Sequence, residues 1–169
     1  MSALLAPARP TRLEAARQAA VALLRRNLTP AGILAASRTQ EAEARRYTRI
    51  FARDAAICIL AMAGSGDLVL EQGAVASLDA LAAKQAPNGQ VAKYVDAEGV
   101  GADFWYVGCI DATLWWLIAV DHVRGAGLVE PERWAAQVDK ALAWLHAQEH
   151  PHFRLLQQNE ASDWADIMP

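Results

Sequence analysis

The sequence predicts an all-α protein built as an array of antiparallel helical hairpins. Hydrophobic residues make up 54% of the 169-residue chain, which is enough for a single domain with a substantial core. In about five segments the apolar residues recur at helical spacing, and turns containing glycine or proline separate these segments. No segment gives a convincing strand, and we expect residues 1–10 to form a flexible N-terminus.

The first helix is predicted over residues 11–28. Thr11 is a candidate N-cap, and Glu14 follows it three positions later, which is the capping-box pattern. The next stretch contains Pro30 and Gly32, which end the helix and begin an irregular connection.

The second helix is predicted over residues 40–63, although residues 47–54 could instead form a loop or a strand that enters it. Residues 64–67, Gly-Ser-Gly-Asp, predict a tight stop. A third helix is then predicted over residues 68–85, and it ends before the strong turn signal Pro-Asn-Gly at residues 87–89.

Residues 87–107 mix glycine, aromatic and charged residues without a helical period, and a long loop of this kind is often functional. The fourth helix, residues 109–125, is apolar nearly all round and is therefore expected to be central. Pro131 opens the predicted fifth helix, residues 131–150. Its tryptophans are expected to be packing residues, and its buried stripe is expected to comprise Trp134, Val138, Leu142 and Leu145.

Charge and cysteine content exclude several classes of function. The formal net charge is −3, the pI is about 5.8, and the arginines are spread without forming the basic patch of a nucleic-acid-binding protein. Cys58 and Cys109 each lie in an apolar run, which favours buried, unpaired thiols in a reducing compartment. No Cys/His spacing indicates a metal, and no cofactor is expected.

The chain is expected to be soluble and cytoplasmic. Its first ten residues lack the charged and apolar regions of a signal peptide. Its longest apolar runs are much shorter than the roughly 20 residues that a membrane span requires, so no membrane partner is expected.

Four clusters of polar and aromatic residues flank the predicted helix ends. They lie at residues 47–55, 88–94, 102–116 and 158–166. Alternate connections of a hairpin array lie on the same face, so the clusters can converge on one rim.

Four motifs in these clusters, in this order and spacing, resemble a known family: FARD at residues 51–54, QAPNGQ at 85–90, DFWYVGCIDATLWW at 103–116 and SDWAD at 162–166. The chain from about residue 45 onward resembles the (α/α)6-barrel glycoside hydrolases, and most of all the bacterial amylo-α-1,6-glucosidase-like, glycogen-debranching-type proteins. The resemblance to neutral invertases and glucoamylases is weaker. The resemblance implies an (α/α)6 toroid, and because five helices cannot build its twelve, we expect an N-terminal half.

The resemblance also implies a sugar-binding subsite. An Arg-Asp pair at the start of an inner helix, here Arg53 and Asp54 after the aromatic Phe51, would hold the sugar in the cleavage subsite. The family's Asp-x-x-Leu-Trp segment matches residues 111–116, with Asp111 as its acidic member. Sugar rings favour flat aromatic platforms flanked by polar groups, and the residue types that suit this role include Asp103, Trp105 and Tyr106.

The resemblance places the catalytic acid in a Trp-x-Asp motif, which Trp164 and Asp166 match. Asp166 is therefore the expected general acid and Asp163 the second choice. Glycoside hydrolysis needs one carboxylic acid to protonate the leaving oxygen and a second carboxylate to activate water or to attack. Apolar or like-charged neighbours such as Trp164 and Glu160 would raise the pKa of the acid. The base of these inverting enzymes comes from the C-terminal half, so we expect the chain to be inactive alone.

Simpler interpretations stand beside these. Arg53 and Asp54 could form an exposed ion pair that contributes little to stability, and Asp111 could satisfy backbone donors at a helix start. Trp115 and Trp116 could be core residues, and the acidic tail could be an ordinary polar chain end. The whole chain could also be a non-catalytic module that binds a sugar or a protein. Such a module would form a homodimer, because a half barrel leaves apolar faces exposed.

Overall fold

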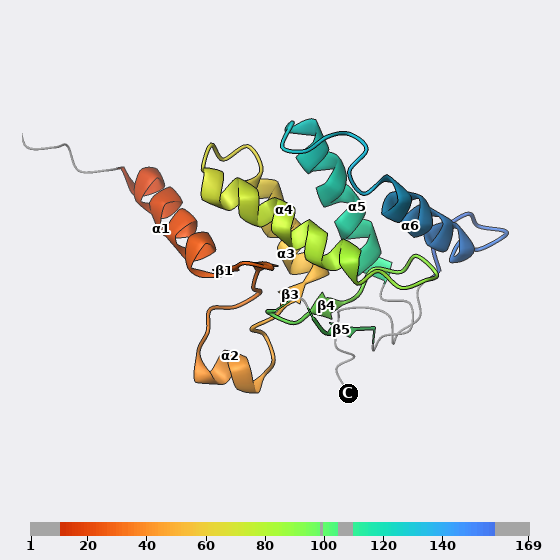
Figure 1. Cartoon of the computed structure of the whole chain (residues 1–169), viewed down its shortest axis with the longest axis horizontal. Coiled ribbons are helices and arrows are strands. Elements are labelled where there is room, and N and C mark those ends of the chain that lie inside the picture. The colour runs from red at the N-terminus through yellow and green to blue at the C-terminus, as the bar shows by residue number, and fades with distance from the viewer. Residues whose placement is uncertain (1–10, 99, 105–109, 158–169) are drawn as a thin grey trace, which may run out of the picture.

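The computed structural model describes residues 11–98, 100–104 and 110–157 (Figure 1). The chain is mostly helical, and these ranges contain six helices and five two-residue strands. In chain order the elements are α1 (Arg12–Arg26), β1 (Leu28–Thr29), β2 (Gly32–Ile33), α2 (Gln40–Ala44), β3 (Ile50–Phe51), α3 (Ala52–Met62), α4 (Leu68–Ala83), β4 (Tyr94–Val95), β5 (Ala102–Asp103), α5 (Ile110–Gly125) and α6 (Ala135–Ala147).

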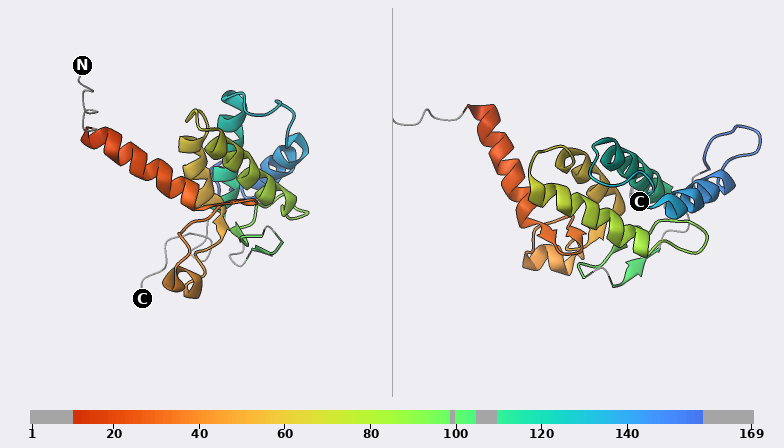
Figure 2. Two further views of the ribbon diagram at one scale, coloured as in Figure 1. Left: turned by 60° about the vertical axis from the view of Figure 1, so that its left-hand side comes forward. Right: turned by 45° about the horizontal axis from the view of Figure 1, so that its top comes forward.

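Helix α1 begins with the predicted capping box. The Thr11 backbone N–H donates to Glu14 Oε2 over 2.6 Å, and the Glu14 N–H donates to Thr11 Oγ1 over 3.2 Å. The hydrogen bonds to Thr11 also hold the pKa of Glu14 below its ordinary value. The helix projects from the body of the molecule, and none of its residues is buried (Figure 2).

The long second helix predicted over residues 40–63 is wrong in its first half. Helix α2 ends after five residues, and the chain passes through β3 before α3 begins. This is the alternative that the sequence left open for residues 47–54. The break follows Arg46, whose φ of +61° is left-handed and cannot continue a helix.

The prediction that the chain forms no strands was also wrong, because two small antiparallel sheets are present in the described residues. β1 pairs with β2, and a second sheet has the order β3-β4-β5. In the second sheet Phe51 lies opposite Tyr94, and Tyr94 lies opposite Asp103. Two-residue strands are too short to show a period of two, so their pairing depends on tertiary contacts.

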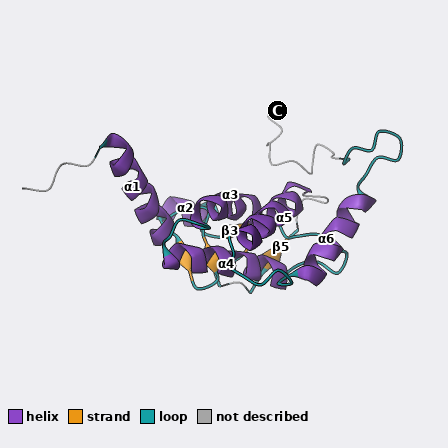
Figure 3. Ribbon diagram, turned by 90° about the horizontal axis from the view of Figure 1, so that it is seen from above, coloured by secondary structure: helices purple, strands orange, loops and turns teal. Residues whose placement is uncertain are grey.

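Helices α3, α4 and α5 form the centre of the molecule, with α1 at one end and α6 at the other (Figure 3). The apolar fourth helix is central, as predicted. Trp116 of α5 is fully buried and its Nε1–H donates to the Leu78 carbonyl over 3.4 Å. The side chains that are fully buried in this core include Ile59, Met62, Leu78, Leu81, Trp116 and Val120.

Helix α6 begins at Ala135, four residues after the predicted start. Residues 131–134 form a turn that ends at Trp134, which has a left-handed φ of +64°. Trp134 and Trp144 are packing residues, as predicted, since both are buried. The predicted stripe is wrong at Leu142, which is 44% exposed; the buried residues within α6 are Ala141, Trp144 and Leu145.

None of the helices in the described ranges is long and apolar enough to cross a membrane.

The tight connections that the sequence predicts are present at residues 64–67 and 87–89, and three glycines in them, Gly64, Gly66 and Gly89, adopt left-handed backbones. Gly64 has a φ of +78° and open space around the position of a Cβ. Gly89 has a φ of +98°, and a Cβ there would collide with the Lys140 carbonyl group of α6. Gly89 is therefore the point where the turn after α4 packs closely against α6.

We predict that Gly89→Ala destabilises the protein much more than Gly64→Ala does. Both changes add left-handed strain of about 1–2 kcal/mol, but only Gly89→Ala adds a collision with backbone, expected to cost roughly 2 kcal/mol more. The free energy of unfolding, measured by urea denaturation of both variants, checks this. Equal losses in the two variants would show that α6 does not pack on this turn.

Candidate functional site

The first turns of α3 and α5 meet at one edge of the molecule. Arg53 Nη1 lies 2.5 Å from Asp111 Oδ2, and Arg53 Nη2 lies 3.7 Å from Asp54 Oδ2. The Arg53 side chain is 29% exposed and that of Asp111 is 17% exposed, so the pair is only partly open to water. The structure therefore brings together three of the predicted substrate-binding residues.

Asp54 and Asp111 lie in the first turns of α3 and α5, at the positive ends of the helix dipoles. Asp111 Oδ1 also accepts the N–H of Ala112 over 2.8 Å. The simpler interpretation of Asp111 as a helix-start carboxylate is thus correct, and it coexists with the contact to Arg53. One carboxylate joins the backbone of α5 to the guanidinium of α3.

A row of aromatic rings lies beside this pair. The ring centroids of Tyr47 and Phe51 are 5.8 Å apart, and those of Phe51 and Tyr94 are 4.9 Å apart. The Arg49 guanidinium carbon lies 4.5 Å from the centroid of the Tyr94 ring. Because Phe51 directly precedes α3, the row continues the edge on which Arg53 lies.

Asp103 reaches this edge through the small sheet, where β5 places it opposite Tyr94. The pKa of Tyr94 is raised above its ordinary value, first by burial and then by a hydrogen bond with the Asp103 side chain and by its charge. Arg49 and Arg46 act in the opposite direction through their positive charges. Segments from three of the four predicted clusters therefore converge, as expected.

The remaining predicted site residues lie outside the described residues. They are the platform residues Trp105 and Tyr106, and the tail residues Glu160, Asp163, Trp164 and Asp166, which include both candidates for the general acid.

The tryptophans of the Asp-x-x-Leu-Trp segment are packing residues. Trp116 is fully buried, and Trp115 is half-buried against the main core. This agrees with the simpler interpretation of the pair, since adjacent helix residues point in different directions.

Sequence reasoning missed Tyr47, Arg49 and Tyr94 as members of the edge. Arg49 is one of the arginines that are spread along the sequence without forming a basic patch, and no local period marks the tyrosines. The available signal was the density of aromatic and basic residues in 47–55 and 88–94, but the β3–β4 register that joins them is a long-range feature.

The described residues contain no group of three or more His, Cys, Asp or Glu that could hold a metal ion. Asp54 and Cys58 lie one helical turn apart on α3. Burial raises the pKa of the Cys58 thiol, and the charge of Asp54 raises it further. This thiol is therefore a poor nucleophile at neutral pH.

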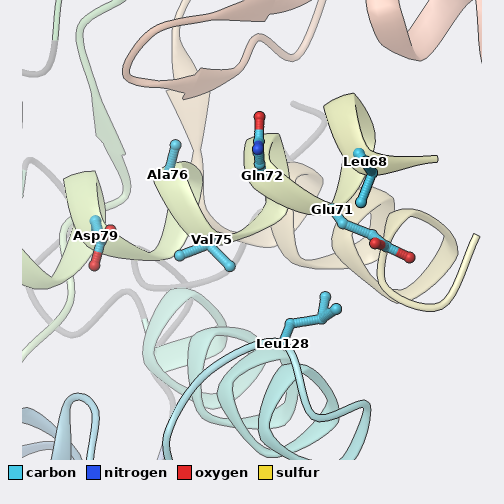
Figure 4. Close-up of a pocket in the computed structure, with 7 residues that line it drawn as sticks. All are labelled: Leu68, Glu71, Gln72, Val75, Ala76, Asp79 and Leu128. Carbon is cyan, nitrogen blue, oxygen red and sulfur yellow. The ribbon is translucent and has the colours of Figure 1, made fainter. Parts of the chain in front are cut away.

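A groove of about 410 Å³ lies along one face of α4 and is separate from the edge described above (Figure 4). The carboxylate of Asp79, which lines the groove, already accepts two hydrogen bonds within the protein, from Arg133 Nη2 over 2.6 Å and from Trp134 Nε1 over 2.9 Å. None of the predicted site residues lines the groove, whose lining comprises Leu68, Glu71, Gln72, Val75, Ala76, Asp79 and Leu128.

Comparisons of the chain with protein-family models, with curated proteins and with solved structures gave no match. The functional assignment therefore depends on the residues of the edge and on the chemistry that they permit.

We predict that Arg53 and Asp111 are energetically coupled. A double-mutant cycle with Arg53→Gln and Asp111→Asn should give a coupling free energy of about 1–2 kcal/mol, because the pair is partly buried and charge-assisted. The matched control is Arg45 and Glu41, 3.0 Å apart with side chains 68% and 74% exposed, where about 0.3 kcal/mol is expected. Urea denaturation measures both, and similar values for the two pairs would contradict the proposed contact.

We predict that Cys58 is alkylated slowly by iodoacetamide at pH 7.5, since its raised pKa leaves little thiolate. Asp54→Asn removes one cause of the rise and should speed the reaction by roughly two- to threefold. Mass spectrometry of the peptide that contains Cys58 separates its reaction from that of Cys109. A rate like that of a free cysteine peptide would show that the thiol is not shielded.

Proposed function

We propose that this chain carries the sugar-binding part of an inverting glycoside hydrolase of the amylo-α-1,6-glucosidase, glycogen-debranching type, which hydrolyses α-glucosidic bonds in the cytoplasm. The observation that supports this most is the pair of Arg53 and Asp111 at the shared edge of α3 and α5. The resemblance of residues 51–54 and 103–116 to this family assigns sugar contacts to both partners, and Arg53 and Asp111, one from each motif, form an ion pair.

The edge has the chemistry that a sugar ring requires. Vicinal hydroxyl groups can donate to Asp54 and Asp111 and can accept from the fork of Arg53. The aromatic row of Tyr47, Phe51 and Tyr94 offers apolar surface for the C–H groups of the ring where it is exposed, and Tyr47 is 50% exposed. A site of this kind orients a ligand with a few polar groups beside an aromatic wall.

Catalysis is assigned to residues beyond this edge. In the proposal Asp166 protonates the leaving oxygen, with Asp163 as the second candidate, and Glu160 and Trp164 contribute to its surroundings. Trp105 and Tyr106, which lie outside the described residues, are assigned to sugar contacts by their residue types. Further helical hairpins would complete an (α/α)6 toroid and supply the base that activates water. The arrangement of α3 and α5 side by side, with α4 packed against both, is compatible with such an array.

The second candidate is a non-catalytic module that binds a sugar or a protein and homodimerises. Helix α1 favours this alternative, because it has no buried residue and its Leu13 is 80% exposed. A 15-residue helix is only marginally stable in water by itself, and the side chains of α1 that pack on the core, Val21 and Leu24, are only partly buried, so a second copy covering α1 would stabilise it. A discrete dimer in light scattering would favour the module, and heterogeneous aggregates would favour an enzyme part.

We predict weak binding of maltotriose by the 169-residue chain, with a Kd of about 1–10 mM because only part of the pocket is formed. Arg53→Lys and Asp111→Asn should each weaken this binding by roughly tenfold. Isothermal titration calorimetry measures the affinity, and circular dichroism checks that both variants remain folded.

The control is Arg25→Lys, which alters a charged pair with Asp67 at the far end of the bundle. It should leave the affinity for maltotriose unchanged. Equal binding by all variants would contradict the sugar contacts. Hydrolysis of maltotriose or isomaltose should be negligible, and steady turnover by the purified chain would show that no further half is required.

A further inference from the structure

We propose that Arg46, Arg49 and the ring of Tyr94 form an anion-binding subsite next to the sugar edge, so that the preferred ligand is a sugar with a phosphate or carboxylate group. This inference rests on the proposed function and narrows its substrate class.

The subsite is held on two elements of the small sheet. Phe51 of β3 and Tyr94 of β4 lie opposite each other, and Arg49 directly precedes β3. Its guanidinium lies 4.5 Å from the centre of the Tyr94 ring. Stacking on an aromatic face uses the plane of the guanidinium and leaves the N–H groups at its rim able to donate. A contact of this kind leaves the N–H groups of Arg49 able to donate to a ligand.

Arg46 occupies a backbone position that normally favours glycine. The turn after α2 closes with the Arg46 N–H donating to the Glu43 carbonyl and the Tyr47 N–H donating to the Ala42 carbonyl. This is the Schellman arrangement, in which the left-handed residue after the helix is usually glycine. Arg46 takes this position with a φ of +61°, and its side chain is exposed. An exposed, strained arginine at this position is one ground for the proposed role of its side chain.

The positive charges of Arg46 and Arg49 are not neutralised locally. Arg45 pairs with Glu41 and Arg53 pairs with Asp111, but within the described ranges neither Arg46 nor Arg49 forms an ion pair with a carboxylate. Both charges are close enough to Tyr94 to oppose the rise of its pKa. Arg49 is in contact with the ring, and the positive charge of Arg46 acts on the same tyrosine.

The neighbouring carboxylate, that of Asp103, forms no ion pair with either arginine of the subsite in the described ranges. Asp103 lies opposite Tyr94 in the sheet and hydrogen-bonds with its side chain. An anionic oxygen on a ligand can accept several N–H groups from two arginines, and such charge-assisted bonds are about twice as strong as neutral ones. The adjacent Phe51 and Arg53 place a sugar ring within reach of the same anion, so a hexose phosphate or a hexuronate fits both parts of the edge.

The test compares the affinities of the whole chain for D-glucose, D-glucose 6-phosphate, D-glucuronate and inorganic phosphate, measured by isothermal titration calorimetry at low salt. We expect at least one charged sugar to bind about tenfold more tightly than glucose, and the advantage to fall as salt is added. The affinities for D-glucose 6-phosphate and D-glucuronate show whether a phosphate or a carboxylate group is preferred. Inorganic phosphate should bind more weakly than the charged sugar, because it has no ring to stack.

Two variants locate the effect. Arg49→Gln should reduce the affinity for the charged sugar roughly three- to tenfold. Arg46→Gly should do the same while raising the urea midpoint of unfolding, since glycine removes the left-handed strain. A variant that binds the charged sugar more weakly but unfolds at a higher urea concentration cannot owe its loss of affinity to misfolding. Arg45→Gln is the matched control, because it removes the neighbouring charge, which is already paired with Glu41.

Equal affinities for glucose and both charged sugars would overturn the inference, as would an equal loss in Arg45→Gln or inorganic phosphate binding as tightly as the charged sugar. If maltotriose still binds through Arg53 and Asp111 in that case, the proposed function stands and only the anion subsite is wrong. If none of these sugars binds at concentrations of about 10 mM, both proposals are wrong.

Discussion

The packing of α3 against α5 determines where the polar side chains of this protein can meet. Both helices bury small residues, which allow two backbones to approach closely; the buried ones include Ala52, Ala55 and Ala56 in α3 and Ala112 and Ala119 in α5. Because both helices begin at the same edge, their first turns lie side by side. Arg53 and Asp111 are distant in sequence, and this contact between helices makes them partners.

The β3-β4-β5 sheet likewise brings together loop residues that are distant in the sequence. Ile50 and Val95 are fully buried and lie opposite each other, so they anchor β3 and β4 to the core. Their neighbours Phe51 and Tyr94 then face each other at the edge. A rigid core beneath a short sheet can thus hold loop residues in fixed positions, which is how binding sites are commonly placed on stable scaffolds.

Most helices were predictable from local signals, whereas the break between α2 and α3 and the residues of the edge were predictable only in part. The capping box at Thr11 and the turns near residues 64–67 and 87–89 are short-range features, and all three are confirmed. The five strands in the described part of the chain have two residues each, and the contact between Tyr94 and Arg49 depends on a register that no local period encodes. Three of the four polar clusters converge as expected, because the order of helical hairpins limits which ends can be neighbours.

The central claim is that sugars bind at the edge formed by α3, α5 and the small sheet. Amide chemical-shift mapping of the ¹⁵N-labelled chain with maltotriose tests it most directly. The account predicts shifts that cluster at residues 50–54, 94–95 and 111–112 and that saturate together at millimolar ligand. Shifts confined to the groove on α4, at residues 68–79, or the absence of any shift would contradict it.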